Sequence, residues 1–145
     1  MKNAICTFTG TAGALIAGLF GGWDASLATL IAFMAIDFVT GLMVAGIFHN
    51  SQKTESGKIE SKASFKGLCR KCMILLFVLI GARLDITIGA SYIRDGICIA
   101  FIVNELISIV ENAGHMGLPI PQVLMSAINT LKSKSENKPE NKEDK

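Results

Sequence analysis

Charged side chains interrupt long apolar stretches at three places in the sequence. Asp37 is the sole formally charged residue in Ala25–Phe48, a run of 24 residues, and Arg83 and Glu105 lie within later apolar segments. A charge in an apolar interior is costly unless an opposite charge or water lies beside it. Two roles therefore stay open for these side chains: ion pairs that fix the register of neighbouring helices, or groups that line a polar path.

The positions of Asp37 and Arg83 along their segments favour a direct pair. Asp37 lies 12 residues after Ala25, about 18 Å along a helix, and Arg83 lies 11 residues after Cys72, about 16 Å. Both side chains would then be near the middle of a hydrocarbon core ~30 Å thick. We therefore predict that Asp37 and Arg83 pair or share a polar path. The further intramembrane polar candidates are Asp85, Asn104 and Glu105.

The positions of cysteine and histidine argue against a metal centre or an enzyme. Cys69 and Cys72 have the C-x-x-C spacing of redox and half-zinc motifs, but a second ligand pair is missing, and His49 and His115 are distant in sequence. We interpret the cysteines as reduced thiols near a membrane surface. Because the sequence also lacks a nucleophile beside a general base, we predict no enzymatic activity, no metal and no cofactor.

The composition indicates which elements must position these charges. Half of the 145 residues are hydrophobic, 18% are charged, and the mean hydropathy is +0.47. These values are typical of a small integral membrane protein, and they leave room for one membrane domain. Only helices and closed barrels satisfy the backbone in lipid, and long apolar runs favour helices. The sequence therefore predicts an all-α integral membrane protein.

The apolar segments divide a membrane domain, residues 1–131, into four spans. The predicted transmembrane helices are residues 4–23, 25–48, 72–90 and 92–110. A cleaved signal peptide is the alternative for the first segment, but a single lysine precedes it and a second span follows at once. A short amphipathic helix at 121–131 suits the inner leaflet. Residues 132–145 contain five lysines and four acidic residues without apolar side chains, so we expect a disordered tail.

A basic loop between the second and third spans sets the predicted orientation. Loop 49–71 has six basic and two acidic residues, a net charge of +4, and such an excess marks the cytoplasmic side. Four spans put both termini and 12 of the 14 basic residues on that side, whereas three spans would separate the two basic regions. Binding of nucleic acid or anionic lipid ranks lower, because any cytoplasmic loop has this composition. The basic residues are Lys53, Lys58, Lys62, Lys66, Arg70 and Lys71.

Small residues recur along the first two predicted spans. In the first span they fall at steps of four, which places them on one smooth face of a helix. Small faces let helix backbones approach closely in lipid, so we expect this face to support packing and self-association. The alternative is that glycine is simply frequent in membrane helices. The candidates are Gly10, Ala14, Gly18, Gly22, Gly41 and Ala45.

Motifs from Gly22 to Leu131 carry a family resemblance through their order and spacing. They are Gly22–Asp24, Ile36–Gly41, Ser64–Gly67, Arg70–Lys71, Leu84–Asp85, Asn104–Asn112 and Gly117–Pro121. With these motifs the chain resembles the phage lysis and toxin-secretion holins of Gram-positive bacteria and their phages.

The resemblance implies a multi-pass protein of the bacterial host's cytoplasmic membrane. Such a holin forms homo-oligomers in the lipid bilayer and opens large lesions that release a cell-wall hydrolase (endolysin), without binding it, or a toxin. Host cell lysis follows. The alternatives are a small ion channel or transporter, in which Asp37, Arg83 and Glu105 would be selectivity or relay groups, and a regulator (antiholin) of another holin.

Overall fold

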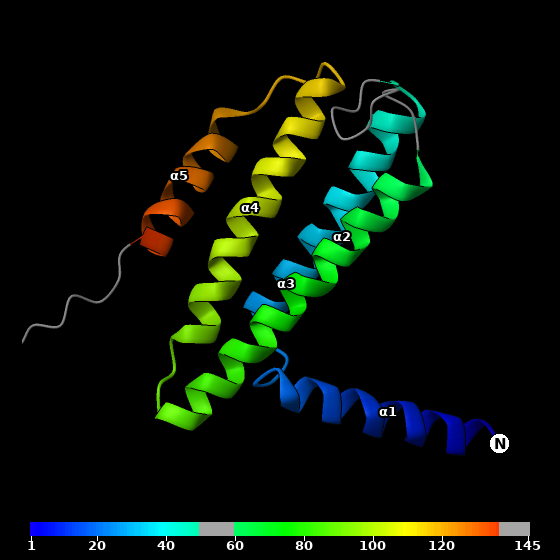
Figure 1. Cartoon of the computed structure of the whole chain (residues 1–145), viewed down its shortest axis with the longest axis vertical. Coiled ribbons are helices and arrows are strands. Elements are labelled where there is room, and N and C mark those ends of the chain that lie inside the picture. Colours follow the sequence, from blue (N-terminus) through cyan, green and yellow to red (C-terminus); the bar gives the residue numbers. More distant parts are fainter. Residues whose placement is uncertain (50–59, 137–145) are drawn as a thin grey trace, which may run out of the picture.

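The computed structural model describes residues 1–49 and 60–136, and within these ranges α-helices joined by short turns are its secondary structure elements (Figure 1). The all-α prediction is confirmed. The described helices are α1 (Lys2–Leu19), α2 (Ala25–Gly46), α3 (Ser61–Ile88), α4 (Ile93–His115) and α5 (Gln122–Glu136).

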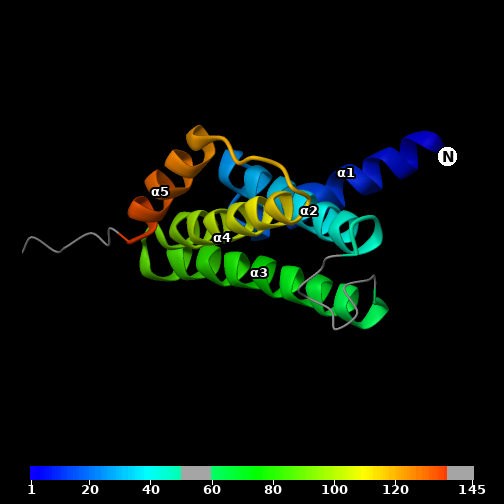
Figure 2. The same ribbon diagram turned by 90° about the horizontal axis from the view of Figure 1, so that it is seen from above.

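Three long helices form a bundle in which α4 lies between α2 and α3 (Figure 2), and α3 runs antiparallel to the other two. Helix α2 packs mainly on α4, α3 also packs on α4, and α2 meets α3 only slightly. We call the end where α2 and α4 finish and α3 begins the basic end, because Lys62, Lys66 and Arg70 lie there. Helix α5 folds back along α4 from that end (Figure 1).

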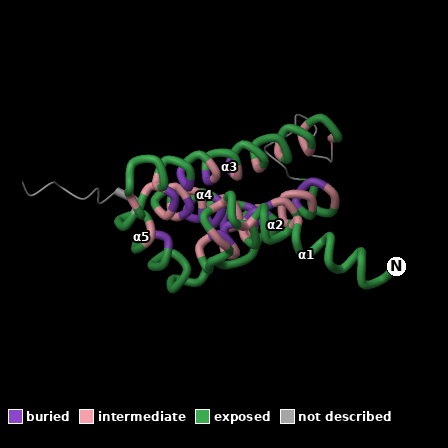
Figure 3. Tube along the Cα trace, turned by 90° about the horizontal axis from the view of Figure 1, so that it is seen from below, coloured by how far each residue is buried: buried purple, intermediate pink, exposed green. Residues whose placement is uncertain are grey.

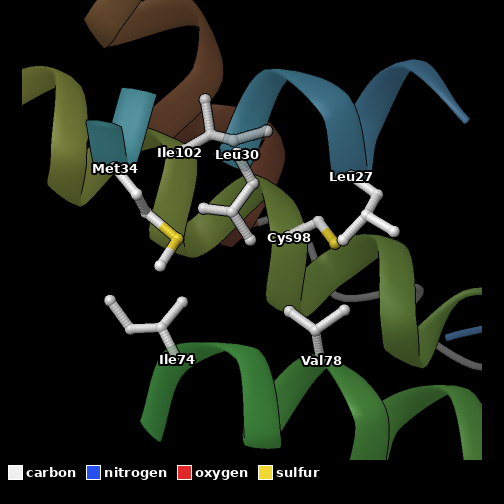
Figure 4. Packing of buried hydrophobic residues seen from close by; sticks show 7 residues of the cluster. All are labelled: Leu27, Leu30, Met34, Ile74, Val78, Cys98 and Ile102. Atoms are coloured by element: carbon white, nitrogen blue, oxygen red, sulfur yellow. The ribbon is translucent and has the colours of Figure 1, made fainter. Parts of the chain in front are cut away.

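The apolar core of the bundle comes from one face of each long helix. Its buried residues are Leu27, Leu30, Met34, Ile74, Val78, Cys98 and Ile102 (Figure 4). The spacings of three and four residues place each set on a single helix face, as amphipathic packing requires. Leu30, Val78 and Cys98 are fully buried where α2, α3 and α4 meet. This core holds the three helices in register.

Helices α3 and α4 approach each other closely at Gly81. A Cβ atom at that position would lie 2.7 Å from Ile97 Cδ1 and 3.1 Å from Arg94 Cα. Since neither distance leaves room for a methyl group, glycine at this position permits the observed helix spacing. The turn from α1 to α2 also needs glycine, because Gly21 and Gly22 have φ values of +80° and +101°.

Much of the bundle is exposed (Figure 3), and many of the exposed residues are large and apolar. On α3, Leu76, Ile80 and Leu84 recur at steps of four on the exposed side. Soluble monomers rarely expose apolar stripes of this size. Within the described part of the chain, α2 is the one helix that is both long and apolar enough to cross a membrane.

Several boundaries differ from those predicted. The second span was expected at 25–48, and α2 ends at Gly46. Loop 49–71 was expected to be non-helical, but α3 begins at Ser61, so Lys62, Lys66, Arg70 and Lys71 are helical. Lys62, Lys66 and Arg70 fall at steps of four and share a solvated helix face, so they do not interrupt the helix. Lys53 and Lys58 lie outside the described residues.

The two terminal helices also differ from expectation. Helix α5 continues to Glu136, so the predicted disorder is wrong for Lys132–Glu136. These residues extend a helix that is anchored by the packing of Ile128. Residues 137–145 lie outside the described part of the chain. Helix α1 stands apart from the bundle, has no buried residue, and meets only α3 (Figures 1 and 3).

Candidate functional site

A lysine bridges two buried carboxylates at the centre of the bundle. Lys71 Nζ, from α3, lies 2.8 Å from Asp37 Oδ2 on α2 and 2.5 Å from Glu105 Oε2 on α4. The side chains of these three residues are between 5% and 12% exposed. One ammonium group therefore joins all three long helices, and charge-assisted hydrogen bonds of this kind are the stronger class.

The carboxylate of Asp37 has a second partner on α4. Asn112 Nδ2 donates to Asp37 Oδ1 at 3.1 Å and to Thr40 Oγ1 at 2.9 Å. The Thr40 hydroxyl in turn donates to the Ile36 carbonyl one turn earlier in α2. Asn112 thus helps to fix the position of the Asp37 side chain from α4.

The register of the helices explains why these three charges meet. Asp37 lies nine residues before the end of α2, Lys71 ten residues after the start of α3, and Glu105 ten residues before the end of α4. At 1.5 Å per residue, each is about 14–15 Å from the basic end. In an antiparallel bundle these three positions lie at one level.

A cavity of about 330 Å³ opens beside the bridge, toward the basic end. Besides Asp37, Lys71 and Glu105, the lining includes three more charged residues and three polar ones: Glu60, Arg70, Glu111, Ser64, Asn104 and Ser108. A polar space of this size accommodates on the order of ten water molecules, if each takes ~30 Å³. The bundle therefore combines exposed apolar side chains on its outside with a charged, polar cavity inside.

A second charged cluster joins the helices at the opposite end. Arg94, at the start of α4, donates from both terminal nitrogens to the Asp24 carboxylate at 2.6 and 3.1 Å and to the Gly22 carbonyl at 3.1 Å. Asp24 also accepts from Leu27 N at 2.9 Å as the N-cap of α2. The Arg94 guanidinium lowers the pKa of Asp24 below its ordinary value of 3.8. This cluster holds the α1–α2 turn against α4.

Asp85 has a structural role at the same end. Its two carboxylate oxygens accept from Ile93 N at 3.0 Å and from Arg94 N at 2.9 Å. The side chain thereby satisfies two free amides in the first turn of α4 and places Arg94 beside Asp24.

The predicted Asp37–Arg83 pair is wrong. Arg83 lies on the exposed side of α3, about 18 Å along the helix from Lys71, which is the residue that reaches Asp37. The prediction began the third helix at Cys72 and so counted Lys71 as part of a loop. Because α3 begins eleven residues earlier, Lys71 enters the bundle as part of the helix.

The other predicted residues fall into three places. Asn104 and Gly41 line the cavity, and Ala45 is buried beside it. Gly10, Ala14 and Gly18 lie on the exposed surface of α1, and Gly22 gives its carbonyl to Arg94. Cys69 and Cys72 are exposed on α3 with free thiols.

Asn112, Asp24 and Arg94 are not among the site residues predicted from the sequence. The sequence did hold an indication for Asn112. It lies seven residues after Glu105, about two helical turns, and therefore on the same face of the helix. The signal for Asp24 was its place as a candidate N-cap before a long apolar run.

Comparison with known proteins links the chain to others of its length. The family model described as the bacteriophage holin family matches residues 14–133. An uncharacterised protein of Listeria monocytogenes is 35% identical over 134 residues, which cover 92% of this chain and 89% of that protein. An uncharacterised protein of Halalkalibacterium halodurans is 38% identical over 125 residues, 82% of this chain and 87% of that protein.

A third relative is an uncharacterised 14.9 kDa protein from the nagH 3′ region of Clostridium perfringens. It is 33% identical over 124 residues, which cover 84% of this chain and 88% of that protein. No solved structure gives a significant match.

Proposed function

The chain belongs to the bacteriophage holin family, and from this membership we propose that it self-associates in the bacterial cytoplasmic membrane and opens large lesions. A cell-wall hydrolase, or in a toxin-releasing bacterium a toxin, then leaves the cell through the lesion, and lysis follows. The chain catalyses no reaction and needs no direct contact with the hydrolase.

The observation that carries the proposal is the charged site beside a polar cavity, inside a bundle with apolar outer faces. Asp37, Lys71 and Glu105 meet beside a polar cavity, while the outer faces of α2 and α3 carry apolar residues. An arrangement with apolar residues outside and polar residues inside suits a helix bundle in lipid. When several copies assemble, the same polar interior supplies side chains for the wall of an aqueous lesion.

In the proposed orientation the basic end faces the cytoplasm. Helices α1, α2 and α4 and the apolar part of α3, from Cys72 on, form four spans with both termini inside. Lys62 and Lys66 then lie near the cytoplasmic surface, in agreement with the positive-inside rule. The α1–α2 turn, with exposed Trp23, lies at the outer interface, where tryptophan is favoured.

Self-association is supported by the unpacked state of α1. Its apolar side chains are exposed in the single chain, and Gly10 and Gly18 have no neighbouring atoms within 4 Å in the described structure. A helix with a small-residue face packs well against another helix in lipid. A second copy of the chain can supply that helix.

The test is inducible expression in a bacterium that holds a wall hydrolase in its cytoplasm. We expect abrupt lysis only when the chain and the hydrolase are present together, with hydrolase in the medium at the time of lysis. Expression of the hydrolase alone is the control. Slow growth arrest with the hydrolase retained in the cells would contradict the proposal.

A small ion channel is the second candidate, and the cavity beside Lys71 is the observation that favours it. The size of the released cargo separates the two functions: a lesion passes proteins from vesicles, whereas a channel passes ions alone. A regulator of another holin would give neither release by itself and would change the lysis time of the partner holin.

A further inference from the structure

Helix α5 is attached to the bundle by a narrow apolar row. Ile128, 6% exposed, packs against Val103, Leu106 and Val110 of α4, and Leu131 extends the same contact. At the start of the helix, Val123 is 80% exposed. The attachment of α5 therefore depends on one face of its second half.

The direction of α5 carries it away from the basic end. Val110 lies five residues before the end of α4, and Val103 lies twelve, or about 8 and 18 Å from that end. Leu131 lines the same groove as Ile99, sixteen residues before the end of α4, about 24 Å. Figure 1 shows α5 descending beside α4 in this way.

This position places polar side chains at depth if the bundle crosses a bilayer. Lys132 and Lys134 are exposed and follow Leu131 directly, and Asn129, Thr130 and Ser133 are exposed as well. Around an inserted bundle these groups would face hydrocarbon well below the headgroups. Lysine and amide side chains are strongly disfavoured there.

The composition of α5 suits the lipid–water interface instead. Leu124, Ile128 and Leu131 form one apolar side, and the polar residues occupy the other. Two more apolar residues, Leu118 and Ile120, are exposed in the segment before the helix. An amphipathic helix of this kind lies in the plane of the membrane with its apolar side 5–10 Å into the boundary region.

We infer that α5 has two positions, one against α4 in the compact chain and one in the inner-leaflet interface once the bundle is inserted. Residues 116–121 form the hinge. Gly117 in this segment has a φ of +78°, a backbone conformation that residues other than glycine rarely adopt. The partner of α5 in the second position is the membrane surface. Val103, Leu106 and Val110 then lose their cover within the chain and face the hydrocarbon. The inference rests on the proposed insertion of α2–α4.

The experiment measures the depth of spin labels along α5 in vesicles of phosphatidylethanolamine and phosphatidylglycerol. The full chain, with its four cysteines replaced, carries one new cysteine at a time: Val123→Cys, Thr130→Cys or Ser133→Cys. All three positions are exposed, so a label does not disturb the packing on α4. Accessibility to oxygen and to a water-soluble nickel chelate gives the depth of each label.

For an interfacial α5 we expect the label at Val123 to be shallow and those at Thr130 and Ser133 to be accessible to the nickel chelate. A helix that stays on α4 gives a different series, in which Ser133 lies up to about 15 Å deeper than Val123. That series would overturn the inference. It would also be overturned if all three labels, Val123 included, were in bulk water.

A label on α2 separates failure of this inference from failure of the proposed function. Ile36, 45% exposed, lies near the middle of α2 and must be in hydrocarbon if the bundle is inserted. A water-accessible label at Ile36→Cys would contradict insertion itself. A deep label at Ile36 together with a deep label at Ser133 would contradict only the second position of α5.

Discussion

Lys71 brings together two carboxylates that would otherwise repel each other in an apolar interior. One ammonium faces two acidic groups, so the cluster keeps a net negative charge when all three residues are ionised. The amide of Asn112 and water in the adjoining cavity can offset that excess. The bridge is also the principal polar link between α3 and α2, whose direct packing is slight. Lys71 is therefore the residue on which the arrangement of the three helices depends most.

We predict that Lys71→Met lowers the free energy of unfolding by about 3–5 kcal/mol, since it removes the ammonium group that the buried carboxylates of Asp37 and Glu105 share. Denaturant unfolding of the full chain in detergent micelles, followed by circular dichroism, measures the loss. Lys66→Met is the matched control, because Lys66 is exposed on the same helix, and it should change stability by no more than about 0.5 kcal/mol.

The triple variant Lys71→Met, Asp37→Asn, Glu105→Gln tests the cause of that loss. Removing all three charges removes the unpaired carboxylates, so most of the stability should return. If the triple variant were as unstable as Lys71→Met alone, packing of the lysine stem rather than its charge would explain the effect.

The Asp24–Arg94 contact predicts how the stability of the chain changes at low pH. Its pKa is lowered by Arg94, so the contact stabilises the chain above the ordinary pKa of 3.8 and is lost as the pH falls through the lower folded value. We expect the wild type to lose stability below pH 4 more steeply than Asp24→Asn, which cannot titrate. Unfolding midpoints between pH 6 and pH 2.5 check this. Equal slopes for both chains would contradict a role for the Asp24–Arg94 contact.

At the scale of the elements, the spacing of α3 and α4 depends on Gly81. A methyl group there would meet Ile97 Cδ1 and the Arg94 backbone, so Gly81→Ala should cost about 1–3 kcal/mol of unfolding free energy through overpacking. Gly67→Ala is the control on the same helix. It has open space around it and should stabilise the helix by up to about 1 kcal/mol. Destabilisation by Gly67→Ala alone would contradict this account.

The sequence predicted some elements better than others, for identifiable reasons. Helix α2 was predicted to within two residues of its observed end, because its apolar run begins after the Asp24 cap and is interrupted only at Asp37. The start of α3 was missed, because lysines were counted as loop charges although Lys62, Lys66 and Arg70 have helical spacing. A net charge locates a membrane surface but does not mark the end of a helix.

Two of the three charged residues of the site were predicted, and the third was missed because the start of α3 was missed. Asp37 and Glu105 were selected because charge is conspicuous in an apolar run, and both lie in the observed cluster. Their partner could not be selected, since pairing depends on helix register, and register depends on where α3 begins. Asp85 was selected as an intramembrane charge, but its role as a cap depends on the α3–α4 turn, which a linear pattern does not define.

The whole molecule divides into a packed bundle and an arm. Helices α2, α3 and α4 share a core and two charged clusters, whereas α1 is joined to them by the Gly21–Gly22 turn and the Arg94 contacts. The direction of α1 is therefore set by a turn rather than by helix packing. In a membrane, lipid and other copies of the chain must supply the surroundings of α1.

This division leads to a prediction about the side of the membrane on which the N-terminus lies. If α1 crosses the bilayer, Asn3→Cys in a chain without other cysteines should be protected from a membrane-impermeant maleimide in intact cells and labelled after permeabilisation. Labelling is measured before any lysis begins. Ser91→Cys, in the outer α3–α4 turn, should be labelled in intact cells, and Lys62→Cys should behave like Asn3→Cys. Labelling of Asn3→Cys in intact cells would place α1 on the outer surface and leave a bundle of three spans, because the positions of α2–α4 do not depend on α1.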